Sequence, residues 1–502
     1  MAEERRGRFQ GSDTSRAEVT IYCHGDDPIV LEPWRGRVYT GGSVTNPDEP
    51  SLIRARTSKR FGAGAGSFSF TAKVPPDEDL LDSLVDDDWV DLSFSSQGRR
   101  HHAMRGIITD ITRTETEVGV TYEVMGREFS YVFEITELWF NRFTAENVTG
   151  EAALRAYGSV VGNFGTIEKN VATFLTGFLR EIGDAGRSLW DLPRSLPGAR
   201  RGARFVDLVA APWSDQWSNE PERHAFNATW GMPPESNLWA LASEWSDPDF
   251  TEMFPELLVE FAGVLDYPSA DSETTPDDTR MAVVLRDRPF PTAEVPGGFR
   301  RSLWFRLPEH VIPMAQVKSP MQLSRSGRER HNAFFVSPVL TQQLTGAPFE
   351  FSAPLWDPVD IRRHGLRRYD LHSRYVAAAP DLNLTLAETS RRRLRDWHVL
   401  NPYFRSGNLM LAPGRPEIRL GSRLRIVSPR GTGHDLLGYV EGVDHEWGGL
   451  EAGVSTQLAV TRMWKGTEDT MLSAISRMQE RYITAGQFNE TPDALDAGEA
   501  AV

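Results

Sequence analysis

The sequence predicts a β-rich α+β protein with two small, related, tube-like β-barrels separated by an α+β insertion. Two stretches of the chain alternate apolar and polar residues at period two, which is typical of half-buried strands. The segment between them places apolar residues at helical spacing. The two β-rich stretches also share a short residue pattern, and such internal similarity indicates a repeated unit. A terminal helix and a flexible tail complete the prediction.

The first β-rich stretch follows a polar arm at 1–17, which we expect to be poorly ordered. Alternation is clearest at 68–74, where apolar side chains occupy every second position, and it recurs at 89–94 and 118–124. Turn signals separate these runs at short intervals, as they do in a sandwich or a barrel.

The pattern changes after residue 136. Apolar residues at helical spacing predict an amphipathic helix at 166–183, and a second helix is predicted at 236–245. Six of the 14 tryptophans fall between Trp190 and Trp245. We interpret them as the aromatic core of an α+β region, with a carbohydrate-stacking face as the alternative.

The internal similarity links strands in the two β-rich stretches. The segment Gly106–Ile108 corresponds to Gly438–Val440, and Tyr122–Val124 corresponds to Leu458–Val460. The predicted strands around them have similar lengths and spacing. Together these matches indicate two related small barrels.

The resulting domain prediction follows the order of the chain. It comprises a flexible arm (1–17), a first tube-like barrel (18–136), an α+β insertion (137–300), mixed β segments with a helix (301–408), a second tube-like barrel (409–466), and a terminal helix with an acidic tail (467–502).

Composition excludes several classes of function. The chain has 55 basic and 70 acidic residues, a formal charge of −15, which argues against a general nucleic-acid binder. The single cysteine, Cys23, excludes a disulfide framework and a multi-cysteine metal site. We expect no secretory signal in the first residues and no membrane span, because no sufficiently long apolar run occurs.

A search for catalytic motifs predicts no active site. The glycine cluster Phe61–Phe68 lacks the ending of a phosphate loop and precedes a strand, so we interpret it as a loop or bulge. We expect His101 and His102 in an exposed hairpin loop rather than in a metal site. Cys23 and His24 adjoin in sequence, which points their side chains to opposite faces of a strand. The sequence therefore predicts no catalytic, cofactor-binding or metal-binding residue, no cofactor, and no enzyme.

Several stretches, taken in order, resemble the baseplate or tail hub proteins of tailed bacteriophages and related contractile injection systems. One resembles the first hub barrel, others resemble its middle segments, and the last resembles its closing barrel. These stretches are Asp91–Gly126, Asn237–Leu258, Met281–Phe290, Arg325–Pro338, Gly365–Tyr375 and 404–463.

The resemblance implies a structural virion protein that acts as a homotrimeric hub in the tail baseplate and is assembled in the host cytoplasm. Its implied partners are a hexameric tail tube protein and a trimeric spike or tip protein, with the tape measure and baseplate wedge proteins as further candidates. DNA would pass through its channel only in transit during ejection. A trimer of two-barrel chains would present six similar units to the tube and three to the spike. The loops at 58–66 and 428–435 are the expected tube-facing edges.

Two alternatives remain open from the residues themselves. One is a cell-wall hydrolase, because some tail-tip proteins carry lytic domains. The other is a glycan-binding tail-tip module, in which Trp213 and Trp217 of the tryptophan-rich stretch would stack on sugars. Contractile and non-contractile tails are not distinguished.

Overall fold

The computed structural model describes most of the chain's β-rich parts. The described residues are 15–23, 27–33, 51–74, 84–116, 119–136, 192–199, 205–210, 237, 239–240, 243, 249, 251–262, 264–269, 271–289, 303–318, 321–338, 354–373, 391–392, 394–427, 435–449 and 453–484. The predicted helix at 166–183, residues 1–14 of the arm predicted at 1–17, and the tail after 484 lie outside these residues. The arm is two residues shorter than predicted, because Arg16 and Ala17 already belong to a strand.

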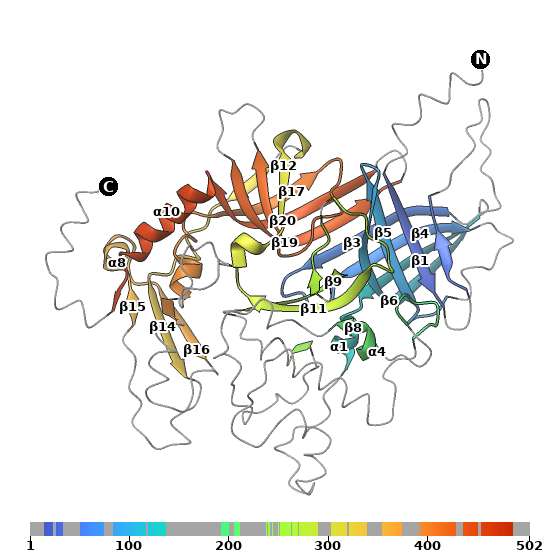
Figure 1. Ribbon diagram of the computed structural model, residues 1–502, viewed down its shortest axis with the longest axis horizontal. Helices are drawn as coiled ribbons and strands as arrows, with labels where there is room; N and C mark the ends of the chain where they lie inside the picture. The colour runs from blue at the N-terminus through green and yellow to red at the C-terminus, as the bar shows by residue number, and fades with distance from the viewer. Residues whose placement is uncertain are drawn as a thin grey trace, which may run out of the picture.

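Seven antiparallel strands form the first barrel (Figure 1). They are β1 (Arg16–Tyr22), β2 (Ile29–Leu31), β3 (Ser51–Arg60), β4 (Ser67–Val74), β5 (Trp89–Ser96), β6 (Arg99–Thr116) and β7 (Gly119–Glu128). Their order is β3-β4-β7-β6-β5-β1-β2, and a bridge between Pro33 and Leu52 joins the two ends of this run. The alternation predicted for 68–74 is confirmed, because Phe68, Phe70 and Val74 all face the barrel core.

The second barrel contains β12 (Glu309–Pro313), β17 (Arg405–Leu411), β18 (Arg423–Val427), β19 (Leu436–Trp447) and β20 (Val454–Lys465). Strand β12 comes from an earlier part of the chain and pairs in parallel with β18. A bridge between Val317 and Leu411 then connects the end of the β12 segment to β17 and closes the barrel. A short strand, β13 (Gln322–Ser324), extends the sheet beyond β17.

The two barrels share one continuous 13-stranded sheet. One half of β19 pairs with β18 inside its own barrel, and the other half pairs antiparallel with β3 of the first barrel. Strand β3 is divided in the same way, because it pairs with β19 at one end and bridges to Pro33 at the other. The predicted β-rich α+β fold with two related barrels is therefore confirmed, and the barrels meet edge to edge.

The internal repeat is visible in strand pairing. The hairpins β6–β7 and β19–β20 each contain a bulge, at 108–110 in one and at 440–442 in the other. The predicted equivalence of Tyr122–Val124 with Leu458–Val460 is wrong by two residues. Val124 lies opposite Ile111, and Leu458 lies opposite Val443, so Val124 corresponds to Leu458. A shift of two residues keeps every side chain on the same face, which is why the alternation could not reveal it.

A second sheet packs beneath the barrels. It contains β8 (Val209–Ala210), β9 (Thr251–Phe261), β10 (Val264–Asp266) and β11 (Thr279–Asp287), with helices α1 (Tyr131–Ile135) and α4 (Phe205–Leu208) nearby (Figure 1). Phe254 and Leu258 of β9 join the hydrophobic core of the second barrel. Only scattered residues of the helix predicted at 236–245 are described, and of these 239, 240 and 243 are helical.

A third, smaller sheet lies beside the terminal helix. It contains β14 (Ala333–Pro338), β15 (Leu355–Trp356), β16 (Arg368–Ser373) and β21 (Ile483–Thr484), and it is accompanied by α8 (Pro358–His364) and α10 (Glu468–Gln479). Short 3₁₀ turns occur at Leu303–Arg306 and Met314–Gln316. The predicted terminal helix is α10, which begins where the Thr467 side chain accepts a hydrogen bond from the backbone N–H of Thr470. Among the described residues, no helix is long and apolar enough to cross a membrane.

Candidate functional site: the junction of the barrels and the adjoining pocket

The junction of β3 and β19 carries charged side chains on its solvent face. The Asp444 carboxylate accepts a hydrogen bond from the Ser58 hydroxyl at 2.6 Å and lies 3.7 Å from Arg56 and 3.6 Å from Arg60. Asp444 is mostly buried, but both arginines are exposed, and ion pairs with exposed side chains contribute little to stability. The backbone pairing of β3 with β19 therefore contributes most to holding the barrels together here.

A buried charge cluster lies behind this junction. The Lys59 ammonium is 2.6 Å from Glu128 of the first barrel and 2.9 Å from Glu256 of β9, and the Arg419 guanidinium is 3.6 Å from Glu256. Burial by itself lowers the pKa of Lys59, but the two carboxylates outweigh this effect and raise it. Lys59 therefore stays charged and ties three parts of the chain together.

Sequence analysis missed this cluster, although one signal was present. Lys59 continues the buried alternating face of β3 that includes Ala55 and Thr57. A lysine on the core face of a strand requires a buried carboxylate partner. Only the fold shows that Glu128 and Glu256 supply two of them.

A second buried cluster corrects the prediction for the two histidines. The turn lies at Gln97 and Gly98, where φ is positive, so His101 and His102 belong to β6 and are buried. His102 Nε2 is 3.1 Å from Asp91, which also accepts two hydrogen bonds from Arg105. Burial alone would raise the pKa of the Asp91 carboxyl. The charges and hydrogen bonds of Arg105 and His102 outweigh burial and hold this pKa well below its usual range. The cluster is a satisfied ion pair inside the first barrel.

Arg286 links the second sheet to the second barrel. Its guanidinium donates hydrogen bonds to the Tyr439 hydroxyl at 2.8 Å, the Gly421 carbonyl at 3.0 Å, the Glu252 carboxylate at 3.1 Å and the Tyr267 hydroxyl at 3.1 Å. Gly421 has a φ of 71°, and a Cβ built there would lie 1.9 Å from Arg286. Glycine is therefore required for both the backbone conformation and the close approach.

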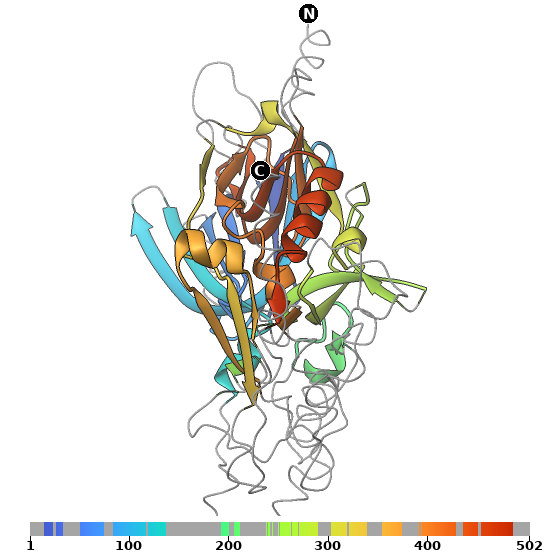
Figure 2. The same ribbon diagram turned by 90° about the vertical axis from the view of Figure 1, so that its left-hand side faces the viewer.

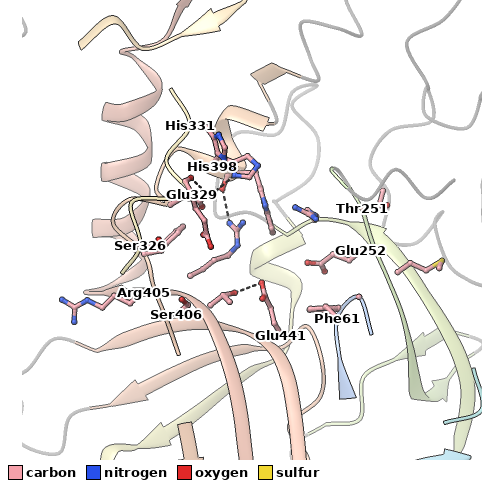
Figure 3. A pocket seen from close by; sticks show the side chains of 18 of the residues that line it. Phe61, Thr251, Glu252, Ser326, Glu329, His331, His398, Arg405, Ser406 and Glu441 are labelled. Atoms are coloured by element: carbon pink, nitrogen blue, oxygen red, sulfur yellow. Dashed lines mark hydrogen bonds between the residues drawn. The ribbon is translucent and has the colours of Figure 1, made fainter. Parts of the chain in front are cut away.

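A pocket of about 500 Å³ opens next to this region, between the second barrel, β9 and the segment at 326–331 (Figure 3). On its barrel side, Glu441 accepts a hydrogen bond from Thr461 at 2.7 Å. The Arg462 guanidinium lies 3.0 Å from the centroid of the Trp397 ring. Burial lowers the pKa of Arg462 to about 9, and burial also raises the pKa of Glu441.

Of the two histidines in the pocket, His398 is a poor catalytic base. Burial, assisted by the charge of Arg462, lowers the pKa of His398 to about 2, and burial also lowers the pKa of His331. A base whose pKa lies far below neutrality contributes little to proton transfer. Within the described parts of the chain, no group of three or more His, Cys, Asp or Glu residues is arranged to hold a metal ion.

The glycine cluster is a turn before a strand, as predicted. Gly62 and Gly64 have positive φ values of 73° and 68°, and the turn connects β3 to β4. The Ala65 N–H donates to Glu134 at 2.5 Å, and the Gly66 N–H donates to Glu128 at 3.1 Å. These contacts bind the turn to the chain itself.

Two loops, at 58–66 and 428–435, were predicted to be tube-facing edges, and the structure describes the first of them but little of the second. At 58–66, residues 58–60 belong to β3 and pair with β19 inside the chain, so this part is not a free edge. The physical reason is that β3 continues past its partner β4 and uses its other side to reach the second barrel. In the loop predicted at 428–435, residues 428–434 lie outside the described residues.

Comparison with known proteins gives similar folds but no family. No protein-family model matches the chain, and no curated protein matches its sequence. Among solved structures, it is similar to the tail protein from Neisseria meningitidis MC58, with a TM-score of 0.45 and 10% identity, covering 89% of this chain and 96% of that one. It is also similar to the prophage MuSo2 43 kDa tail protein from Shewanella oneidensis, with a TM-score of 0.46 and 9% identity over 89% and 98% of the two chains.

A third similar structure is the prophage tail protein gp18 from Listeria monocytogenes EGD-e. The TM-score is 0.42 and the identity 9%, over 93% of this chain and all of that one. With TM-scores below 0.5, these likenesses are distant.

Proposed function

We propose that the chain is a structural tail protein of a bacteriophage or a related particle, and that it forms the hub of the tail baseplate. The observation that carries this proposal is the edge-to-edge union of two similar barrels in one sheet. Three such chains in a closed ring would present six similar barrels. This ring fits a six-fold tube on one face and a three-fold spike on the other, as the sequence resemblance implies.

The same proposal covers the partners and the location. The hub would sit in the virion tail after assembly in the host cytoplasm, between a hexameric tube protein and a trimeric spike or tip protein. Tape measure and baseplate wedge proteins would be its further neighbours. DNA would cross the ring during ejection, and the net charge of −15 would disfavour its adhesion, because DNA binding depends on basic residues that contact phosphates.

We also propose that the protein is not an enzyme. Two features support this. Among the described residues, the charged clusters at Lys59 and Asp91 are ion pairs closed within the protein. The histidines in the pocket have pKa values lowered by burial.

Light scattering and electron microscopy test the proposal. A trimer should have a mass of 3 × 56.3 = 168.9 kDa and should appear as a ring with six similar lobes. An epitope tag on the chain should be found at one end of the tail in purified particles. A tag distributed along the tail shaft, or absent from purified particles, would contradict the hub role. Degradation of cell-wall material in a zymogram would contradict the non-enzymatic role.

A further inference from the structure

We propose that neighbouring chains join through strand β6 of one chain and strand β13 of the next. The pairing would be antiparallel and would repeat, between chains, the pairing that β19 and β3 make inside each chain. This inference rests on the proposed ring but goes further, because it specifies the two edges, their register and the residues that meet.

The first step is the equivalence of β6 with β19. Both strands are the first of a long hairpin, and both contain a bulge two to four residues after an equivalent glycine, Gly106 in one and Gly438 in the other. Ile111 lies opposite Val124, just as Val443 lies opposite Leu458. The second half of β6 therefore corresponds to the half of β19 that pairs with β3.

The second step is the equivalence of β13 with β3. Strand β4 pairs with β7 on one side and with β3 on the other. Strand β17 pairs in the same way with β20 on one side and with β13 on the other. Strand β13 therefore occupies, in the second barrel, the position that β3 occupies in the first.

The third step is the difference in burial between the equivalent halves. Gly442–His445 of β19 are buried where they pair with β3. The corresponding residues of β6 are Asp110–Arg113, of which Asp110, Thr112 and Arg113 are exposed and Ile111 is half-buried. Pairing of β6 with β5 ends at Ile107, and beyond the backbone contacts of Ile108 no strand in the described residues pairs with this edge. Figure 2 shows the β6–β7 ribbon projecting from the side of the molecule.

Strand β13 provides the complementary edge. It pairs with β17 on one side, while no described strand pairs with its other side, and Gln322 and Ser324 are exposed. A groove of about 710 Å³ runs beside it along β17 and is lined by residues that include Leu323 and Met410. Open strand edges of this kind pair readily with other chains unless they are covered.

The equivalence fixes the register. Inside the chain, Asp444 lies opposite Ser58 and His445 lies opposite Thr57. Ser324 lies opposite Ser406 of β17 as Ser58 lies opposite Ser67 of β4, so Ser324 is the equivalent of Ser58. The equivalent positions therefore place Thr112 of one chain opposite Ser324 of the next, and Arg113 opposite Leu323. Because the two edges differ, the contact is head to tail. A head-to-tail contact closes into a ring of three two-barrel chains only where successive barrels are related by about a sixth of a turn.

Paired cysteines test this register in the full-length chain. Thr112→Cys and Ser324→Cys, introduced together, should form disulfides between chains on oxidation, and a non-reducing gel should show linked species that stop at the trimer. Facing residues of antiparallel strands have Cβ atoms about 4.5–5.5 Å apart, which is close to the separation a disulfide needs. The wild-type chain, whose only cysteine is buried Cys23, gives the background.

A matched control uses Glu115→Cys with Ser324→Cys. These positions are three residues out of register and lie on opposite faces of the sheet, so we expect no linked species. Under reducing conditions, both double variants should unfold at the wild-type temperature, which shows that the substitutions leave the fold intact.

Each outcome separates the interface from the function. A 168.9 kDa trimer in which Thr112→Cys and Ser324→Cys remain unlinked would overturn the interface but leave the proposed hub standing. Equal linking in both double variants, linked species longer than a trimer, or a monomer without links at high protein concentration would also overturn the interface. A linked trimer that fails to bind the tail tube would support the interface and contradict the hub function.

Discussion

Lys59 shows how much of this fold depends on individual buried charges. It is one of five lysines in the chain, and its side chain is 7% exposed. Each of its two carboxylate partners comes from a different part of the fold, Glu128 from the end of β7 and Glu256 from β9. Removing the cation would leave Glu128 without its cationic partner and would leave Glu256 with Arg419 alone, at 3.6 Å. The cost falls mainly on Glu128, whose pKa burial already raises.

We therefore expect Lys59→Met to lower the free energy of unfolding by about 3–5 kcal/mol, the usual cost of breaking a buried ion pair. Urea unfolding followed by circular dichroism measures this change. Arg54→Ala is the matched control, because Arg54 pairs with Glu446 at the same junction but is 56% exposed. This control should cost no more than about 1 kcal/mol. Equal decreases in the free energy of unfolding of the two variants would show that the buried cluster contributes no more to stability than the exposed ion pair.

Three buried histidines lie on strands that come from different parts of the chain, and we call this group the histidine seam. His101 belongs to β6, His310 to β12 and His445 to β19, and each is at most 3% exposed. Burial, together with the nearby charge of Arg419, lowers the pKa of His101 to about 4 and those of His310 and His445 to about 3. All three are neutral in the folded protein at pH 7.

The histidine seam should make stability depend on pH. The pKa of each histidine is lower in the folded state than in the unfolded state, where it is about 6.5, so the unfolded chain binds more protons below that pH. The free energy of unfolding should fall as the pH decreases from about 6.5 toward 4, by up to about 1.4 kcal/mol per pH unit for each histidine. Urea unfolding at a series of pH values measures this slope.

A single substitution identifies the groups responsible. His310→Gln should make the slope shallower between pH 6.5 and 4, because it removes one titrating group. Val311→Thr, on the same strand, should leave the slope unchanged, because it removes no titrating group and Val311 is 42% exposed. If both variants kept the wild-type slope, the acid sensitivity would have another origin.

Strands were predictable from sequence where one face of a sheet is buried. At 68–74, the alternation follows directly from side chains that point to opposite faces of β4. Strand β12 could not be recognised in the same way, because it has only five residues and pairs with β18, more than 100 residues later. The misplaced histidines have a similar cause, since the turn at Gln97 and Gly98 precedes them and nothing local shows what covers β6.

At the scale of the whole molecule, each barrel contributes side chains to the hydrophobic core of the other. Trp447 and Val454, from strands of the second barrel, belong to the hydrophobic core of the first. Phe61, at the end of β3, packs against the core of the second. Because each core is completed by the other half of the chain, the barrels should fold together.

A fragment ending at residue 136 tests this interdependence. It contains all seven strands of the first barrel but lacks Trp447, Val454 and the strand that pairs with β3. We expect the fragment to unfold without the cooperative transition of the full-length chain. Urea unfolding of both proteins, followed by circular dichroism, measures the difference. A sharp transition in the fragment at the midpoint of the intact protein would show that the first barrel is independent.

The sequence by itself determined the β-rich class, the repeated barrel pattern and the terminal helix, because periodicity and local caps are properties of neighbouring residues. It left the partners of Lys59 and His102 unknown, and it misaligned β7 with β20 by two residues. Only the tertiary structure decided these points, together with the union of β3 and β19 and the open edges of β6 and β13. The physical reason is that pairing between distant strands depends on which edges the closed barrels leave available, and this information is absent from any short stretch of sequence.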